Sequence, residues 1–289
     1  MKFTPRHIEG NVNVSKTHPL VEFGWLLGGL LLLVVVGYIL LGVATEIAVA
    51  RIPVRAEVWI GEHFTDRMDA LQSEALQARL DKLLEGLPAD SPLHEYVFSV
   101  QLVENEAINA LALPGGHIVV FSGLVEQAES ENEVAMVLAH ELGHFAHRDH
   151  LRRLGRGLSL ALGAFLLFGE DSATGELLNR FLLVSESHYS REQESAADRF
   201  GLELLVACYG HAGGATDFFD RVGKDAGSRI PYLLASHPHP GDRVRELQGL
   251  VAANGYRVDS VIPLGQDLLK DFPASKEPPG KKQASTSGK

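Results

Sequence analysis

The sequence contains a single cysteine, Cys208, among its 289 residues. One thiol cannot form an intramolecular disulfide, and it excludes zinc fingers and knuckles that need several cysteine ligands. Cys208 follows the apolar residues Leu204, Leu205 and Val206, so we expect a packed thiol rather than a nucleophile. The cysteine content therefore leaves the redox compartment open.

Positive charge is also scarce. Lys and Arg total 26 against 37 Asp and Glu, which gives a formal net charge of −11. Nucleic-acid-binding proteins present a basic surface, so this composition argues against a nucleic-acid partner. With 45% hydrophobic and 22% charged residues, the chain has enough apolar sequence for a folded core.

Charge is absent from residues 25–44. A run of about 20 apolar residues crosses a bilayer as a helix, so we predict one transmembrane helix over residues 24–45, after a short N-terminal segment, 1–23. A buried core helix would carry a polar stripe, which this run lacks. A cleaved signal peptide is the stronger alternative, because residues 48–50 read Ala-Val-Ala, but the apolar run is longer than a signal core.

The charges around the span predict its orientation. Lys2, Arg6 and Lys16 precede it, whereas Arg51 and Arg55 follow it. The positive-inside rule then keeps the N-terminus in the cytoplasm. We therefore predict a single-pass membrane protein that contacts lipid through one helix and carries its remaining domain on the extracytoplasmic, periplasmic side.

Alternating patterns after the span predict a small sheet among helices. Apolar spacing predicts a helix over residues 66–87 and a strand over 96–103. Residues 107–112 and 117–121 flank a Pro-Gly-Gly turn and predict a hairpin. The pattern is helical from Ser122 almost to Gly255.

Two further segments complete the expected organisation. The apolar stretch 158–168 is too short to span a membrane, so we predict a buried or membrane-facing helix there. Residues 271–289 are rich in Pro, Gly, Lys and Ser and predict a disordered tail. We expect one α+β domain over residues 46–270, mostly helical with a small β-sheet.

Residues 140–144 read His-Glu-Leu-Gly-His. Two histidines four residues apart lie on one face of a helix, where both imidazoles can bind one metal ion. Glu141 lies beside that face and can accept a proton from a water at the metal. A five-residue match also arises by chance, so the motif does not decide the function alone.

Catalytic zinc commonly has three protein ligands, and His150 is one candidate for the third. Its spacing from His140 is that of metzincins, but His147 stands where those enzymes need a glycine. All three methionines precede the motif, so the methionine turn of that class is missing. We therefore interpret His147 and His150 as part of a solvated, positively charged helix end.

Glu194 is the other candidate, within residues 190–198, Ser-Arg-Glu-Gln-Glu-Ser-Ala-Ala-Asp. Glu194 and Asp198 are four residues apart and share one face of a predicted helix. Apolar neighbours favour burial, and buried carboxylates need partners. One carboxylate can bind the metal while the other accepts the second N–H of a ligating imidazole. An exposed acidic face is the competing interpretation.

Four segments in this order resemble the M48 zinc metallopeptidases, gluzincins that include HtpX-like and CAAX prenyl protease-like enzymes. They are Asn-Ala-Leu-Ala-Leu-Pro-Gly-Gly-His-Ile-Val-Val-Phe-Ser-Gly-Leu at 109–124, residues 140–144, residues 190–198, and Ser-His-Pro-His-Pro-Gly-Asp-Arg at 236–243. The resemblance covers more than half of the chain. It implies a zincin-type domain, here of a single-anchor, compact type.

The resemblance also implies the roles of individual residues. It implies one Zn²⁺ per chain, with His140, His144 and Glu194 as ligands. Glu141 would be the general base, and Asp198 would hold a ligating imidazole. His237 would approach the site and stabilise an oxyanion, although His237 and His239 could also simply pack.

The predicted strand after the glycine turn offers a place for substrate. If it lies at the edge of the sheet, a polypeptide can add to it as a further strand, with Gly116, Ile118, Val119 and Val120 as docking residues. An interior strand, paired on both sides, is the alternative.

Main-chain docking selects extended segments rather than a particular sequence. We therefore predict a membrane-anchored zinc endopeptidase that hydrolyses peptide bonds of unfolded or damaged proteins. A non-proteolytic, membrane-tethered zinc protein that binds such polypeptides is the alternative, and Glu141 argues against it because a structural zinc site needs no base. The sequence leaves the oligomeric state open.

Overall fold

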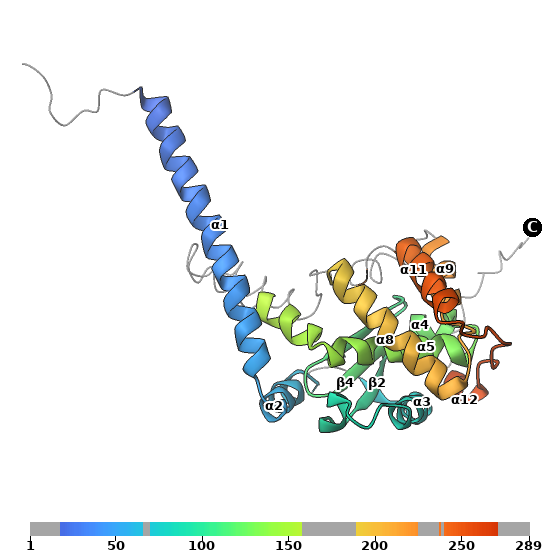
Figure 1. Cartoon of the computed structure of the whole chain (residues 1–289). Coiled ribbons are helices and arrows are strands. Elements are labelled where there is room, and N and C mark those ends of the chain that lie inside the picture. Colours follow the sequence, from blue (N-terminus) through green and yellow to red (C-terminus); the bar gives the residue numbers. More distant parts are fainter. Residues whose placement is uncertain (1–17, 66–69, 158–188, 225–236, 238–239, 271–289) are drawn as a thin grey trace, which may run out of the picture.

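A computed structural model describes residues 18–65, 70–157, 189–224, 237 and 240–270. One long helix leads into a domain of helices packed around a small sheet (Figure 1). The predicted fold class, α+β and mostly helical with a small sheet, is confirmed. The predicted helix at 158–168, the predicted tail at 271–289 and His239 lie outside the described residues.

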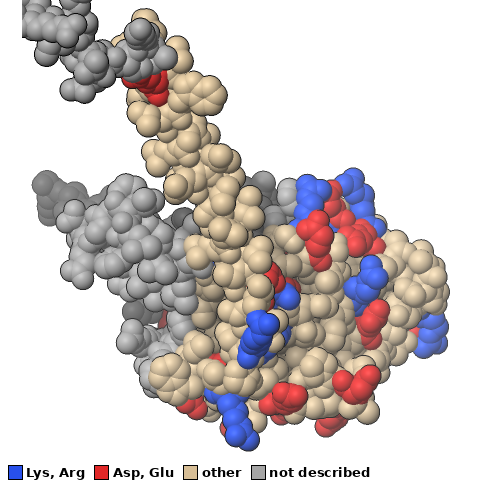
Figure 2. All heavy atoms as spheres, turned by 60° about the vertical axis from the view of Figure 1, so that its left-hand side comes forward, with Lys and Arg blue, Asp and Glu red and all other residues tan. Residues whose placement is uncertain are grey.

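The apolar run forms helix α1, Pro19–Arg51. The Nδ1 atom of His18 accepts the N–H of Leu20 at 3.2 Å and caps the start of α1. The helix is longer than the predicted span of 24–45, and at 33 residues it extends about 50 Å. Its apolar side chains are exposed, and its visible face carries few charges (Figure 2). It is long and apolar enough to cross a membrane.

The chain enters the domain through α2, Val54–Thr65, and the short strand β1, Leu71–Gln72. The helix predicted over 66–87 is shorter than expected, because α3 spans only Glu74–Glu85. Ser73 ends the strand and begins the helix, since its hydroxyl accepts the N–H of Leu76 at 3.1 Å. Leu71, which fitted the helical spacing, instead pairs with Leu102 in the sheet.

The sheet contains three further strands among the described residues. They are β2, Ser99–Val103; β3, Ala110–Leu113; and β4, His117–Phe121. The strand predicted over 96–103 begins later because the 3₁₀ helix η1, Pro92–Glu95, precedes it. The predicted hairpin is confirmed, since β3 and β4 pair antiparallel. Gly115 and Gly116 form its turn with φ of 85° and 91°, which glycine adopts without strain.

The strand order is β1-β2-β4-β3. β4 pairs with β2 on one side and β3 on the other, so the prediction that β4 lies at the sheet edge is wrong. Its central residues Ile118, Val119 and Val120 are at most 1% exposed. A run of apolar residues buried on both faces is typical of an interior strand. Within the described part of the chain, β3 forms this edge of the sheet.

Helix α5, Glu131–Ala146, packs against β3 and against α8, Arg191–Tyr209. Two glycines permit close contact between these helices. A Cβ atom on Gly143 would lie 2.7 Å from the Cα of Ala197, and one on Gly201 would lie 3.0 Å from the backbone nitrogen of His140. The segments carrying the two predicted motifs therefore lie directly against each other.

Four further helices of the described residues surround this core. They are α4, Ser122–Gln127; α9, Asp217–Lys224; α11, Pro240–Ala253; and α12, Gln266–Lys270. Helix α11 packs against α8 and α9, α4 against β4, and α12 against α3 and α4. Cys208 lies near the end of α8, with Sγ 3.5 Å from the carbonyl oxygen of Lys82. Partial burial raises the pKa of its thiol, which fits the predicted packed thiol.

Candidate metal centre

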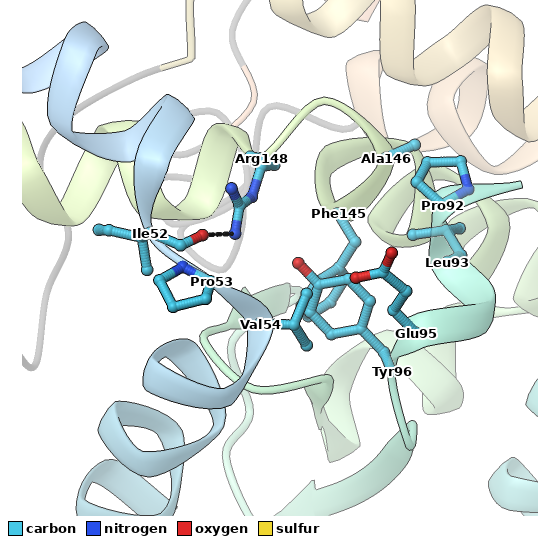
Figure 3. A pocket seen from close by; sticks show the side chains of 10 residues that line it. All are labelled: Ile52, Pro53, Val54, Pro92, Leu93, Glu95, Tyr96, Phe145, Ala146 and Arg148. Carbon is cyan, nitrogen blue, oxygen red and sulfur yellow. Dashed lines mark hydrogen bonds between the residues drawn. The ribbon is translucent and has the colours of Figure 1, made fainter.

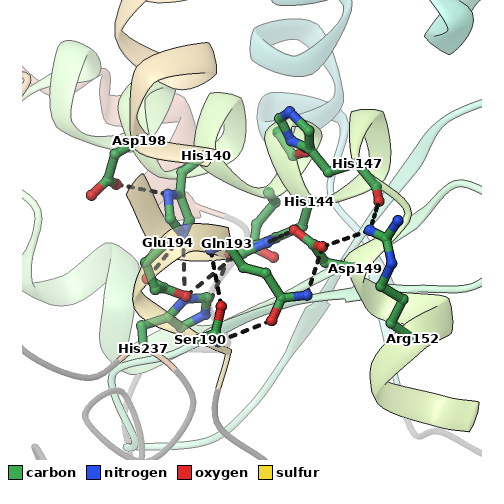
Figure 4. A network of polar contacts seen from close by, with 12 residues as sticks. His140, His144, His147, Asp149, Arg152, Ser190, Gln193, Glu194, Asp198 and His237 are labelled. Atoms are coloured by element: carbon green, nitrogen blue, oxygen red, sulfur yellow. Dashed lines mark hydrogen bonds and ion pairs between the residues drawn. The ribbon is translucent and has the colours of Figure 1, made fainter. Parts of the chain in front are cut away.

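Two capped helices bring the candidate ligands together. Ser130 begins α5 by accepting the N–H of Glu133, and Ser190 begins α8 with a reciprocal capping box to Gln193. One ligand atom from each of four residues lies within 4.8 Å of the others (Figure 4). The four are His140, His144, Glu194 and His237. All four residues are buried.

Glu194 lies centrally among the three imidazoles. Its Oε1 lies 3.0 Å from Nδ1 of His237 and 3.5 Å from Nε2 of His144. Its Oε2 lies 3.7 Å from Nε2 of His140. The structure thus brings together the three residues that the sequence predicted as ligands, with His237 beside them, as the resemblance implied.

The buried donor set suits a divalent cation. Nε2 of His144 and Oε2 of Glu141 are buried and make no hydrogen bond. Buried polar atoms without partners are rare in folded proteins. Imidazole nitrogens and carboxylate oxygens are common zinc ligands. A zinc ion therefore fits this site.

Each histidine of the 140–144 motif is oriented by its own carboxylate. Nδ1 of His140 lies 2.9 Å from Asp198, and Nδ1 of His144 lies 3.1 Å from Asp149. Tyr189 stacks on the His144 ring, with centroids 3.8 Å apart. Both carboxylates contact Nδ1, so Nε2 of each ring faces the other candidate ligands. Nε2 of His140 lies 3.2 Å from Nδ1 of His237. The sequence predicted the orienting role for Asp198 but missed Asp149, whose only signal was an acidic residue shortly after the motif.

Arg243 on α11 joins the two carboxylates of α8. Its Nε and Nη2 atoms donate to Asp198 at 2.8 and 2.6 Å, and Nη1 lies 3.0 Å from Oε2 of Glu194. The guanidinium is itself buried. Arg243 belongs to the 236–243 segment, and the sequence predicted no role for it. The signal available in the sequence was indirect: carboxylates that are predicted to be buried need a cation nearby.

These contacts set the charges of the site. Burial alone would raise the pKa of Glu194, but His237 and Arg243 hold that pKa well below its ordinary value. Burial, together with the charge of Arg243, lowers the pKa of His140. Glu194 is therefore held as a carboxylate, and a neutral His140 imidazole is favoured, which are the forms that bind a metal.

His150 does not belong to this cluster. It is 3% exposed, and its Nε2 lies 2.6 Å from Oε1 of Glu57 on α2. The interpretation of His150 as part of a solvated helix end is therefore wrong. Helix α5 ends at Ala146, and Arg148 has φ of 56°. This turn ends α5 and redirects the chain, so that His150, within the helical residues 149–157 that follow, packs inward.

The four residues predicted to dock substrate lie in a turn or inside the sheet, where a further strand cannot pair with them. Gly116 lies in the turn, and Ile118, Val119 and Val120 are buried within the sheet. Their main-chain groups already pair with β2 and β3. Within the ranges that the structure describes, the free edge of the sheet nearest α5 belongs to β3, for which the sequence predicted no docking role.

The sequence model described as peptidase family M48 matches residues 70–251. This match covers more than half of the chain. The chain belongs to peptidase family M48. M48 metallopeptidases depend on a metal ion, usually zinc, which agrees with the donor set of the cluster.

Several M48-related proteins are similar to this chain. The mitochondrial metalloendopeptidase OMA1 of Arabidopsis thaliana is 30% identical over 204 residues, 70% of this chain and 42% of that protein. The beta-barrel assembly-enhancing protease of Escherichia coli K12 is 29% identical over 191 residues, 61% and 37%. Metalloprotease LoiP of the same strain is 27% identical over 159 residues, 52% and 61%. The chain thus spans about two fifths of the length of the first two relatives.

Proposed function

We propose that this M48 protein is a zinc-dependent endopeptidase. The observation that carries the proposal is the buried cluster of His140, His144 and Glu194, with Glu141 beside it. A purely structural metal site has no use for a buried carboxylate whose Oε2 atom makes no hydrogen bond. Such an atom is suited to accept a proton.

We propose that Asp198 and Asp149 hold the imidazoles of His140 and His144 in place. A bound zinc ion would supply a Lewis acid that lowers the pKa of water and polarises a peptide carbonyl. Glu141 accepts the proton of the attacking water and passes it to the leaving amine. Nε2 of His237 lies 3.6 Å from Oε1 of Glu141, and this closeness to the proposed base supports the proposal that His237 donates to the oxyanion.

We propose that substrate binds along β3. Helix α5 packs against this strand, and among the described residues only β4 pairs with it, along one of its two edges. An extended polypeptide can therefore pair with the other edge through main-chain hydrogen bonds. Such pairing reads little side-chain sequence. It suits unfolded or damaged proteins as substrates, and hence a role in protein quality control.

Replacement of Glu141 by Gln tests the reaction. The purified, zinc-loaded variant should keep its zinc by metal analysis and lose about 10²- to 10⁴-fold in cleavage of an unfolded protein. A chelator should abolish cleavage by the unmodified protein, and added zinc should restore it. Glu203→Gln, at an exposed position of α8, is the matched control and should cleave normally.

Two other results would contradict the mechanism. Normal cleavage by Glu141→Gln would remove Glu141 from the base role. Binding of unfolded protein without cleavage, by the unmodified zinc-loaded chain, would support the non-proteolytic alternative.

We further propose that α1 anchors the chain in a membrane, with the peptidase domain on the extracytoplasmic side. The exposed apolar surface of α1 supports anchoring, and the excess of Lys and Arg before the span supports the orientation. When the protein is expressed in Escherichia coli, protease added to intact spheroplasts should digest the domain. Full protection of the domain would show the opposite orientation. A mature N-terminus at Arg51 would instead show cleavage as a signal peptide.

A further inference from the structure

A second buried polar cluster lies where α1 and α2 meet the domain, outside the metal centre. Its centre is Glu57 on α2, whose side chain is fully buried. Oε1 of Glu57 accepts from Nε2 of His150 at 2.6 Å and from the backbone N–H of Gly115 at 3.3 Å. Oε2 accepts from the Tyr96 hydroxyl at 2.8 Å and from Nη2 of Arg148 at 3.2 Å.

Arg148 extends this cluster to the end of α1. Its Nη1 donates to the carbonyl of Val49 at 3.1 Å. Its Nη2 donates to the carbonyl of Ile52 at 2.7 Å (Figure 3). A helix leaves its last carbonyl groups without intrahelical partners. The guanidinium of Arg148 donates to one carbonyl in the last turn of α1 and to the carbonyl of its C-cap residue, and it also pairs with Glu57.

The Glu57 cluster contacts two segments near the proposed substrate site, namely the residues after α5 and the turn after β3. Arg148 and His150 bracket Asp149, which orients the candidate ligand His144. Gly115 belongs to the turn that follows β3, the proposed docking strand. Helix α2 lies tightly on this turn, because a Cβ atom on Gly61 would overlap the carbonyl of Pro114.

We propose that Glu57 is a positioning residue for the peptidase site. Together with Arg148, it holds the end of α1, the chain after α5 and the turn after β3 in one arrangement. The candidate membrane anchor is then a structural part of the active-site scaffold and not only a tether. The inference rests on the proposed endopeptidase function for its kinetic consequence.

The test uses the full-length, zinc-loaded protein in detergent micelles. Glu57→Gln keeps the side-chain shape and removes the charge. We expect amide hydrogen exchange to accelerate about tenfold or more at residues 113–116 and 147–150, and zinc release to a chelator to accelerate about threefold or more. Zinc stoichiometry should stay at one, while kcat falls and KM rises for an unfolded protein substrate.

Three companion variants separate positioning from general destabilisation. Tyr96→Phe removes one hydrogen bond to Glu57 and keeps the ring packed on Phe145, so it should give smaller changes in the same segments. Arg148→Lys keeps the positive charge but removes the guanidinium that contacts Val49 and Ile52. Amide hydrogen exchange should therefore accelerate at residues 49–52 together with 147–150. Arg55→Gln, at an exposed position of the same helix as Glu57, should change nothing.

The proposal is overturned if Glu57→Gln leaves exchange and zinc release unchanged, or if exchange accelerates evenly over the domain. If Glu57→Gln does not fold, Tyr96→Phe carries the test with the same two outcomes. Exchange and zinc release are measured without substrate. Absence of cleavage by the unmodified protein would therefore overturn the proposed function and leave this inference to be decided by those two measurements.

Discussion

Glu194 and His150 show how residues with similar prospects in the sequence take different places in the fold. Both follow the 140–144 motif, and each was a candidate for the third ligand. Glu194 lies among the imidazoles of the cluster, held there by Arg243. His150 instead pairs with Glu57 on α2, outside the cluster. We therefore expect different defects when Glu194 and His150 are each replaced.

Glu194→Ala removes a proposed ligand and should lower zinc affinity by more than about 100-fold, beyond the loss typical of an outer-shell partner, with loss of cleavage. His150→Ala should keep zinc and instead destabilise the fold by about 1–3 kcal/mol, because the buried carboxylate of Glu57 loses a hydrogen-bond partner. Chelator competition and urea unfolding measure the two effects. Zinc loss in His150→Ala, with Glu194→Ala unaffected, would restore His150 as the third ligand.

At the scale of elements, the contact between α5 and α8 decides the geometry of the metal centre. α5 carries two proposed ligands, and α8 carries the third. Their close approach depends on Gly143, where any side chain would meet the backbone of Ala197. The glycine inside the 140–144 motif thus has a packing role that is separate from metal binding.

Gly143→Ala should separate the helices, destabilise the fold by about 1–3 kcal/mol and weaken zinc binding. Gly249→Ala is the matched control, since it lies in helix α11 with no atom near a built Cβ. Helix propensity alone should stabilise that variant by up to about 1 kcal/mol. Thermal unfolding and zinc competition distinguish the two. Equal effects of both substitutions would mean that the helix contact is not tight at Gly143.

The edge strand β3 gives a prediction that replaces the one for β4. The backbone N–H of Phe121 donates to the carbonyl of Asn109, and Leu111 stands opposite Val119. Pairs alternate along an antiparallel ladder, so Leu111 is expected to bond to β4, whereas the N–H of Ala112 points to the open edge.

Ala112→Pro should therefore keep the fold and zinc but weaken cleavage, because it removes one outward donor. Leu111→Pro removes a ladder bond and should destabilise the sheet. Circular dichroism, zinc content and KM for an unfolded protein measure these effects. Normal cleavage by a folded Ala112→Pro variant would place substrate away from β3.

At the scale of the whole molecule, the Glu57 cluster links stability to pH. Burial alone would raise the pKa of Glu57, but the hydrogen bond and charge of His150, with hydrogen bonds from Tyr96 and Gly115, lower it to about 2. A depressed pKa in the folded state contributes stability above the ordinary pKa of 4.5, and this contribution is lost as pH falls from 4.5 towards 2.

The shift corresponds to a contribution of about 3 kcal/mol. The difference in unfolding free energy between the unmodified protein and Glu57→Gln should therefore be largest near neutral pH and shrink below pH 4.5. Urea unfolding at several pH values measures this difference. A constant difference between pH 7 and pH 3 would contradict the predicted acid sensitivity.

The sequence by itself determined the features that depend on near neighbours. The uncharged run became α1, and the two glycines after Pro114 became the turn of a hairpin. The spacing of His140 and His144, and of Glu194 and Asp198, correctly placed each pair on one face of a helix. Helical and turn periodicities act within about four residues, so these local patterns could be read directly from the chain.

Only the tertiary structure decided which distant segments share a partner. The parallel pairing of β2 with β4 moved Ile118 and its neighbours into the sheet and left β3 at the edge. Arg243 lies 45 residues from Asp198, and His150 lies 93 residues from Glu57. Burial forces such charged groups to pair, but the choice of partner depends on how the helices and strands pack, which no local pattern specifies.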